Sequence, residues 1–249
     1  MADPRTTAAA VKGPIGKLGG RWMISREIKA LCDQTGLGPR EMYFRGRFGV
    51  LGEVDADVVT SVAVFFPPQH VKESWDGGRR LPTTEAVEMY AQACQAWGRR
   101  NLAAHPGIER IADLLEPVVE NASSIGAPLF AGWRAVPLPK GDGPGRAAQL
   151  LHVVRELRGG LHAAVVVAEG LDPLEATLAA DHLGTPLSDV ATGEMVARFF
   201  TWPEPYATPS REAVERRQRV EEQTDKLMIP AFSVLNEGES DELISLLRL

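Results

Sequence analysis

Apolar side chains recur at helical spacing along several stretches of the chain, and short segments rich in glycine and proline separate those stretches. The helical spacing covers residues 26–35, 83–102, 210–228 and 240–249. The apolar face is broad in residues 83–102 and sparse in residues 210–228, which are highly charged. The pattern predicts a mainly α protein.

Two similar turns separate predicted helices. Gly36 to Pro39 ends the first helix, because glycine suits a helix C-cap and proline starts a helix better than it continues one. Gly170 to Pro173 repeats this arrangement, with Asp172 as the expected N-cap of the next helix. Residues 55–66 are predicted as a further helix that stops at two prolines, although their valines also permit a strand.

The two turns belong to a longer internal similarity at an offset of 134 residues. Residues 36–66 and 170–200 share nine identities, counted without gaps in 31 positions, and the paired Phe65-Phe66 and Phe199-Phe200 are among them. The alternative is that two helical segments merely share composition. We expect two tandem helix-turn-helix or winged-helix-like repeats packed as a pseudo-symmetric pair.

The repeat suggests a division of the chain. The first repeat is predicted at residues 16–115 and the second at residues 147–236, with a C-terminal helix at 237–249. Residues 116–146 form a connector whose part from 136 to 145 is too rich in proline and glycine for regular structure. The apolar segment 128–133 is expected to lie across both halves.

Composition narrows the functional classes. The chain has 249 residues and a net charge of −6, which argues against tight sequence-independent binding to nucleic acid. Two cysteines, Cys32 and Cys94, have neither a disulfide framework nor metal spacing. The sequence has no apolar run long enough to span a bilayer and no signal-peptide pattern. We therefore expect a cytoplasmic protein without a membrane partner.

Several segments resemble the SalK/EvbL-like family of actinobacteria. They include residues 41–52, with Phe65-Phe66 after them, and residues 126–131, 151–164, 170–176 and 224–227. The resemblance implies a largely helical fold of two helix-turn-helix-like, partly winged units and a connection with specialised metabolism. Residues 201–206 depart from the family's second wing.

A helix-turn-helix shape raises the question of DNA binding. The candidate second helices are residues 55–66, which carry no cation, and residues 188–200, where Arg198 is outnumbered by acidic residues. A recognition helix usually presents cationic or amide side chains to base edges. The basic clusters at residues 40–47 and 216–219 lie elsewhere, and the second has the spacing of a solvated helix face with ion pairs. A transcriptional regulator stays the alternative function.

Histidines supply the candidate chemistry. His152 and Glu156 are four residues apart and share a helix face, where the carboxylate would orient the imidazole; an exposed pair away from the apolar stripe is the alternative. His162 begins an apolar segment that is expected to be buried, after two glycines that would offer backbone N–H groups at a helix start. A core histidine satisfied by a neighbour is the alternative for His162.

Arg47 lies among aromatic residues and glycines, so a buried guanidinium there would need an anionic partner. We expect it to face the His152 and His162 region across a cleft, or else to pair with Glu41 or Asp55. Aromatic residues at the predicted joints could line an apolar pocket, and the predicted ligand contacts are Arg47, Tyr43, Phe48 and Trp133.

The sequence therefore predicts a protein that binds a small organic ligand, anions included, in a cleft between the repeats. Acid-base chemistry would use His162 or His152, with Glu156 as the orienting group. No cofactor is identified, and no zinc or di-iron spacing appears in the sequence. A non-catalytic partner protein is a further alternative, with a homodimer contact through residues 243–249 or Phe65-Phe66.

Overall fold

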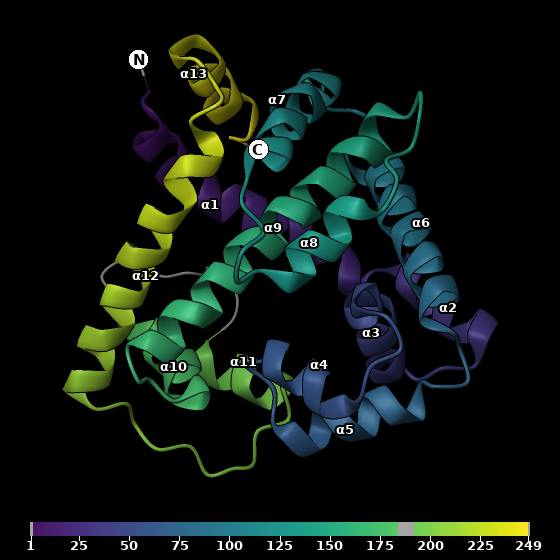
Figure 1. The fold of residues 1–249 in the computed structure, drawn as a ribbon, viewed down its shortest axis with the longest axis vertical. Coiled ribbons are helices and arrows are strands. Elements are labelled where there is room, and N and C mark those ends of the chain that lie inside the picture. Colours follow the sequence, from purple (N-terminus) through teal and green to yellow (C-terminus); the bar gives the residue numbers. More distant parts are fainter. Residues whose placement is uncertain (1, 184–191, 249) are drawn as a thin grey trace.

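A computed structural model describes residues 2–183 and 192–248, and within those ranges every regular element is a helix (Figure 1). The mainly α helix-turn-helix prediction is thereby confirmed as a fold class. The elements in chain order are α1 (Pro4–Arg21), η1 (Trp22–Ile24), α2 (Arg26–Thr35), α3 (Pro39–Phe48), η2 (Gly49–Leu51), α4 (Ala56–Val62), α5 (Pro68–Gly77), α6 (Thr83–Asn101), α7 (Ile108–Asn121), α8 (Pro128–Ala135), α9 (Gly143–Ala168), α10 (Pro173–Ala179), η3 (Ala180–His182), α11 (Gly193–Phe199), α12 (Arg211–Phe232) and α13 (Glu237–Leu246).

Helix α9 forms the centre of the molecule. It packs against α1, α6, α7, α8 and α12 (Figure 1). Its N-terminal two-thirds is therefore buried on nearly all sides and places small and branched apolar residues in the main core, including Leu150, Leu151, Val154 and Leu157. A helix enclosed on every side is not amphipathic, so its buried positions cannot be read from a single apolar stripe.

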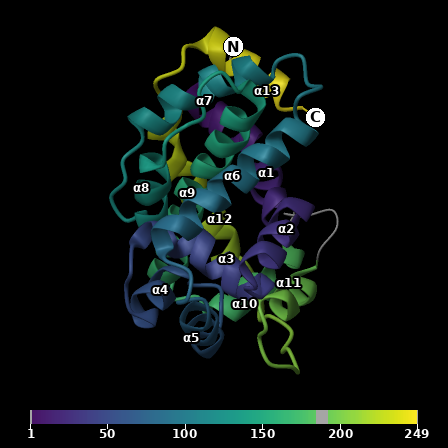
Figure 2. The same ribbon diagram turned by 90° about the vertical axis from the view of Figure 1, so that its right-hand side faces the viewer.

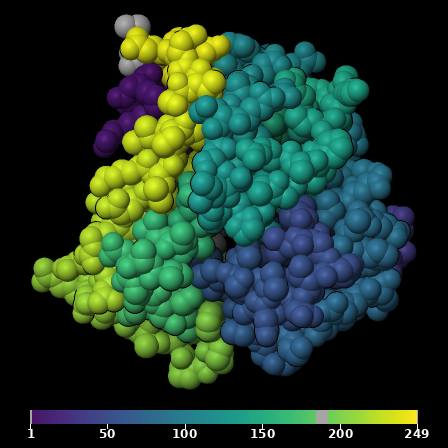
Figure 3. All heavy atoms as spheres, viewed as in Figure 1, coloured from purple at the N-terminus to yellow at the C-terminus, as the bar shows by residue number. Residues whose placement is uncertain are grey.

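The two groups of short helices lie together at one end of the molecule. Helices α3, α4 and α5 and helices α10 and α11 occupy the lower part of both ribbon views, whereas α7, α13 and both described chain ends lie in the upper part (Figures 1 and 2). In the space-filling view the blue-violet α3–α5 part and the green α10–α11 part meet along a seam (Figure 3). This seam is called the junction below.

The turns at residues 36–39 and 170–173 have similar backbone conformations. Gly36 and Gly170 both have left-handed backbones, with φ of 69° and 62°, and both follow a helix directly or after one residue. Pro39 and Pro173 each stand at the first position of the next helix, and the Asp172 side chain accepts hydrogen bonds from two backbone N–H groups there. These glycines end helices in the manner that the sequence predicts.

One phenylalanine from each half packs against the hydrophobic core of the other half. Phe65 packs against the small core of the second half, and Phe200 packs against the core of the first half. The rings of Phe66 and Phe200, which are equivalent at the 134-residue offset, have centroids 4.4 Å apart. The neighbouring equivalents differ, since Phe65 packs against the second half whereas Phe199 is 61% exposed. The tandem repeat itself stays a prediction.

Several local predictions need correction. Residues 55–66 form a helix only from Ala56 to Val62, with no strand. The described residues contain no wing, because helix α5 follows α4 and residues 201–210 carry no regular element. Of the predicted helix 188–200, residues 188–191 lie outside the described ranges, and α11 covers Gly193–Phe199.

The connector also differs from expectation. Helix α7 runs across the predicted boundary at residue 116, and α8 lies inside the connector with Phe130 and Trp133 fully buried, so this segment is core and not a surface strap. Helix α9 starts at Gly143, within the stretch expected to be irregular. The domain boundaries themselves stay predictions.

The expected environment of His162 is wrong in two respects. Gly159 and Gly160 lie inside α9, so they do not open a helix and their N–H groups offer no anion site. The segment after His162 is not buried all round, since Val167 is 68% exposed. In the part of the chain that the structure describes, no helix is both long and apolar enough to cross a membrane.

Candidate functional site

Arg47 of α3 and Glu156 of α9 form a buried ion pair between the first half and the central helix. The Arg47 Nε donates to Glu156 Oε1 and Nη2 donates to Oε2, both at 2.9 Å, in a two-pronged arrangement. The third nitrogen, Nη1, donates to the Tyr43 hydroxyl at 2.5 Å. The Glu156 side chain is 1% exposed and also accepts from Arg155 at 2.9 Å. Neither Glu41 nor Asp55 is the partner of Arg47.

His152 lies beside this pair and is fully buried. Its Nδ1 is 3.7 Å from Glu156 Oε1, and neither ring nitrogen has a hydrogen-bond partner. The imidazole stands edge-on to Trp22 and Trp133, with ring centroids 5.0 and 4.5 Å away. The exposed His152–Glu156 pair that the sequence allowed is therefore wrong, because α9 is covered on the side where these residues point.

Burial and charge set the ionisation of this inner cluster. Burial alone would raise the pKa of Glu156, but the charges of Arg47, His152 and Arg155 outweigh burial and lower this pKa to about 2. Burial lowers the pKa of His152 to about 3, with Arg155 and Arg47 adding to the effect and Glu156 opposing it. Near neutrality the cluster therefore holds an ionised carboxylate and a neutral imidazole.

The remaining predicted contacts surround the same pair. Trp133 donates its indole N–H to the Arg47 carbonyl at 2.9 Å. The Arg47 guanidinium lies over the ring of Phe48 at 4.9 Å and over that of Tyr43 at 5.5 Å. Arg47, Tyr43, Phe48, Trp133, His152 and Glu156 are thus brought together, but as a packed cluster in which the guanidinium already has its partners.

His162 is placed apart from that cluster, near the other end of α9. Its Nδ1 lies 3.2 Å from the Thr224 hydroxyl of α12, and its ring stacks on Phe65 at 5.7 Å and 30°. The side chain is 13% exposed, and Nε2 has no hydrogen-bond partner among the described residues. His162 therefore reaches the junction with one ring nitrogen unpaired.

A second charged cluster surrounds His162. Glu221 accepts from Arg158 and from Arg217 at 2.7 Å each, and Arg158 also donates to Asp225 at 2.8 Å. Burial raises the pKa of Glu221, yet Arg158 and Arg217 lower it to about 2. Burial, Arg217 and Arg158 together lower the pKa of His162 to about 3 against the opposing effect of Glu221. This imidazole is also neutral near pH 7.

This second cluster was not predicted from the sequence. Arg217 is 4% exposed and Glu221 is 6% exposed, whereas residues 216–219 were predicted to form a solvated helix face. The predicted i,i+4 pairing is present between Arg217 and Glu221, but on the inward side of α12. The signal that could have found Arg217 is its place in the helical row of Ala213, Val220, Thr224 and Met228, all of which are buried.

The first half has the connectivity of a helix-turn-helix motif. Helices α2 and α3 pack against each other across the glycine-containing turn at residues 36–38, and α4 follows α3 after η2. The sequence of the chain matches a helix-turn-helix family over residues 10–249. The chain belongs to this family. No curated protein and no solved structure matches it.

Because helix-turn-helix proteins commonly place a helix in the major groove of DNA, DNA must be considered as a partner of this chain. In this helix-turn-helix protein α3 is buried along Phe44, Arg45 and Phe48 and cannot enter a groove. On α4 the exposed charge is Asp57, and the Thr60 and Ser61 hydroxyls donate to carbonyls of their own helix. These side chains are poorly suited to phosphate or base contacts.

Helix α11 gives a similar result. Its cation, Arg198, pairs with Glu204 at 2.7 Å, and its exposed surface is largely Met195 and Phe199, at 51% and 61% exposure. Over its described residues this helix-turn-helix protein therefore shows no cationic ridge on α4 or α11.

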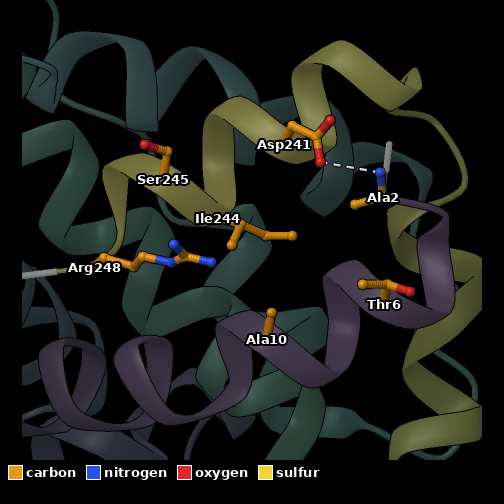
Figure 4. Close-up of a pocket in the computed structure, with 7 residues that line it drawn as sticks. All are labelled: Ala2, Thr6, Ala10, Asp241, Ile244, Ser245 and Arg248. Atoms are coloured by element: carbon orange, nitrogen blue, oxygen red, sulfur yellow. Dashed lines mark hydrogen bonds between the residues drawn. The ribbon is translucent and has the colours of Figure 1, made fainter.

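A separate pocket of about 310 Å³ lies between α1 and α13, close to both described chain ends (Figure 4). Asp241 accepts a hydrogen bond from the Ala2 backbone N–H at 3.0 Å on one side, and the Arg248 side chain extends over Ala10 on the other. The residues that line it are Ala2, Thr6, Ala10, Asp241, Ile244, Ser245 and Arg248. None of the predicted site residues lines this pocket.

At the junction itself, Figure 3 shows a narrow hollow where the blue-violet and green parts meet.

Proposed function

We propose that this helix-turn-helix protein binds a small organic ligand at the junction between its two halves, next to His162. The observation that carries the proposal is the His162 ring, which is held by Thr224 and Phe65 from two different parts of the chain while its Nε2 stays unpaired at a partly exposed position. Polar groups without a partner in a sheltered place are commonly satisfied by a ligand or by water.

Binding fits the ionisation of the two candidate histidines better than acid-base catalysis. A general acid or base works best with a pKa near the working pH. The pKa values of His152 and His162 are both lowered to about 3, so neither imidazole carries a proton to donate near neutrality. His152 is also fully buried in the core, and Glu156 accepts hydrogen bonds from two arginines.

Arg47 is better suited to hold two parts of the protein together than to bind an anionic ligand. Its guanidinium already makes two bonds to Glu156 and one to Tyr43, so an anionic ligand would have to displace an internal carboxylate. Breaking a buried ion pair is costly. We propose that Arg47 and Glu156 fix the first half against the central helix and thereby hold the junction in one geometry.

The proposed pseudo-symmetric repeat and the SalK/EvbL-like relationship agree with this function. A duplicated scaffold in which Phe65 packs against the second half and Phe200 against the first would create one shared surface between its halves. The resemblance supports a role for that surface in specialised metabolism, with the protein located in the cytoplasm.

Native mass spectrometry of the freshly purified full chain tests the proposal. We expect a copurifying small molecule on the parent protein that is lost in His162→Gln, while His182→Gln, which changes an exposed histidine, retains it. Unfolding in urea establishes whether His162→Gln leaves the fold intact. A ligand that persists in His162→Gln at unchanged stability would contradict the proposed place of binding.

A transcriptional regulator is the second candidate, and the family match favours it. Fluorescence anisotropy with a labelled random duplex separates the two functions. A DNA-binding protein would bind at low salt and release the duplex at moderate salt. Because α4 and α11 present so little positive charge, we expect no binding at either salt concentration.

A further inference from the structure

The neighbours of His162 determine which of its two ring nitrogens carries the proton. A threonine hydroxyl has one proton to donate. Thr224 donates that proton to the Val220 carbonyl of its own helix, at 2.7 Å. With that proton engaged, the Thr224 oxygen is placed to accept from His162 Nδ1, which lies 3.2 Å away. The geometry therefore favours the neutral tautomer with its proton on Nδ1.

Glu221 favours a second proton on this ring, but burial, Arg217 and Arg158 outweigh it and keep the pKa of His162 low. Glu221 Oε1 is 3.8 Å from Nδ1, beyond hydrogen-bond distance. Both Glu221 oxygens already accept from arginines, Oε1 from Arg217 and Oε2 from Arg158. The groups that face His162 from α9 and α12 thus include two cations whose charge opposes an imidazolium. Nε2 is left as an unprotonated nitrogen with a free lone pair.

Phe65 fixes the direction of that lone pair. Its ring stacks on the imidazole face at 5.7 Å, and the Trp202 indole N–H holds the Phe65 carbonyl at 2.9 Å. The imidazole plane is therefore held by a hydrogen bond at Nδ1 and by an aromatic ring on one face. A group that approaches Nε2 must do so in the ring plane.

We propose that His162 Nε2 is a specificity-determining acceptor, which selects organic ligands that present an O–H or N–H group and disfavours those that present a carboxylate or phosphate. This inference rests on the proposed function, because it names the ligand chemistry of the same site. A hydroxyl, amine or ammonium group donates to the lone pair, whereas an anionic oxygen would place its own lone pairs against it. The ligand class is thus narrower than the sequence indicated, and anions are disfavoured.

The tautomer is tested first, on the full chain labelled with ¹⁵N-histidine. Long-range ¹⁵N NMR distinguishes a protonated from an unprotonated ring nitrogen, and His162→Gln assigns the signals. We expect protonated Nδ1 and unprotonated Nε2. Thr224→Val removes the acceptor and should give a mixture of tautomers, whereas Thr60→Val, which changes a similar helix hydroxyl on α4, should leave the His162 signals unchanged. A proton on Nε2 in the parent protein overturns the inference.

Ligand chemistry is tested next with phenol, anisole and benzoate as probes of similar size. Phenol has a donor, anisole has the same ring and oxygen without one, and benzoate has only acceptors. We expect phenol to shift the Nε2 signal at a concentration about tenfold below that needed for either of the others, the factor that one net hydrogen bond supplies.

The outcomes separate the two proposals. Equal shifts with phenol and anisole would show a binding site that does not select donors, and would overturn only the inference. Preference for benzoate would overturn it in favour of an anion site. No shift with any probe, in a chain with the expected tautomer, would count against binding at the junction and therefore against both.

Discussion

Replacing Glu156 by glutamine tests whether the buried ion pair locks the junction. The substitution keeps the shape of the side chain and removes its charge. One oxygen that accepts from Arg47 becomes an NH2 group that faces an N–H, so the guanidinium is left buried with a poor partner. Removing one member of a buried ion pair costs about 3–5 kcal/mol. The hydrogen bond from Arg47 to the replaced oxygen accounts for about 1.5–3 kcal/mol of that cost.

The assay is equilibrium unfolding in urea at pH 7, followed by tryptophan fluorescence and by circular dichroism. The control is Glu242→Gln, which breaks the exposed pair with Arg110 and should leave the midpoint unchanged within error. The double variant Arg47→Met/Glu156→Leu should recover most of the lost stability, because it removes both charges together. A loss below about 1 kcal/mol in Glu156→Gln would refute the reasoning and would mean that water reaches Arg47.

Four further predictions concern the free energy of unfolding. His152 has its pKa lowered from 6.5 to about 3, so between these values the unfolded chain binds a proton that the folded chain does not. This residue alone should lower the free energy of unfolding, as the pH drops from 6.5, by at most about 1.4 kcal/mol per pH unit. His162 adds a slope of the same kind, so His152→Leu should reduce, and not abolish, the slope measured by urea unfolding across pH. Gly159→Ala should raise the free energy of unfolding by about 0.5–1 kcal/mol, since an added Cβ meets nothing within 4 Å in this part of α9. Gly46→Ala should lower it clearly, because its Cβ would lie 2.4 Å from the Tyr90 ring. A double-mutant cycle on Phe66→Ala and Phe200→Ala should give a coupling of about 0.5–1.5 kcal/mol if their rings join the two halves.

Local elements were predictable because their signals are local. The turn at Gly36 and the cap at Asp172 depend on a few neighbouring residues, and both occur as the sequence indicates. Helix α1 was missed, since its glycines and Pro14 give it little helical signature, and it forms by packing along α9 and α12.

The site was only partly predictable because its contacts join residues far apart in the chain. Arg47 was expected to need a carboxylate, but Glu156 is 109 residues away, and nothing in the sequence distinguishes it from Glu41 or Asp55. His152 and Glu156 were placed off the apolar stripe of their helix, which is correct as periodicity. The structure buries them because neighbouring helices cover that side as well.

The arginines explain how a helix-turn-helix scaffold can serve a small ligand. Arg45 is fully buried and binds Glu53 and the Leu81 carbonyl, while Arg47 and Arg217 bind Glu156 and Glu221 inside the molecule. Cations used in this way cannot contact phosphates, so they add nothing to affinity for DNA. Arg47 instead ties α3 to α9, and Arg217, which also donates to the Ala176 carbonyl, ties α12 to α10. A binding site is selective only when its surrounding residues are held in place. The internal ion pairs of these arginines therefore argue against DNA binding and, at the same time, hold the surroundings of the His162 ring in place.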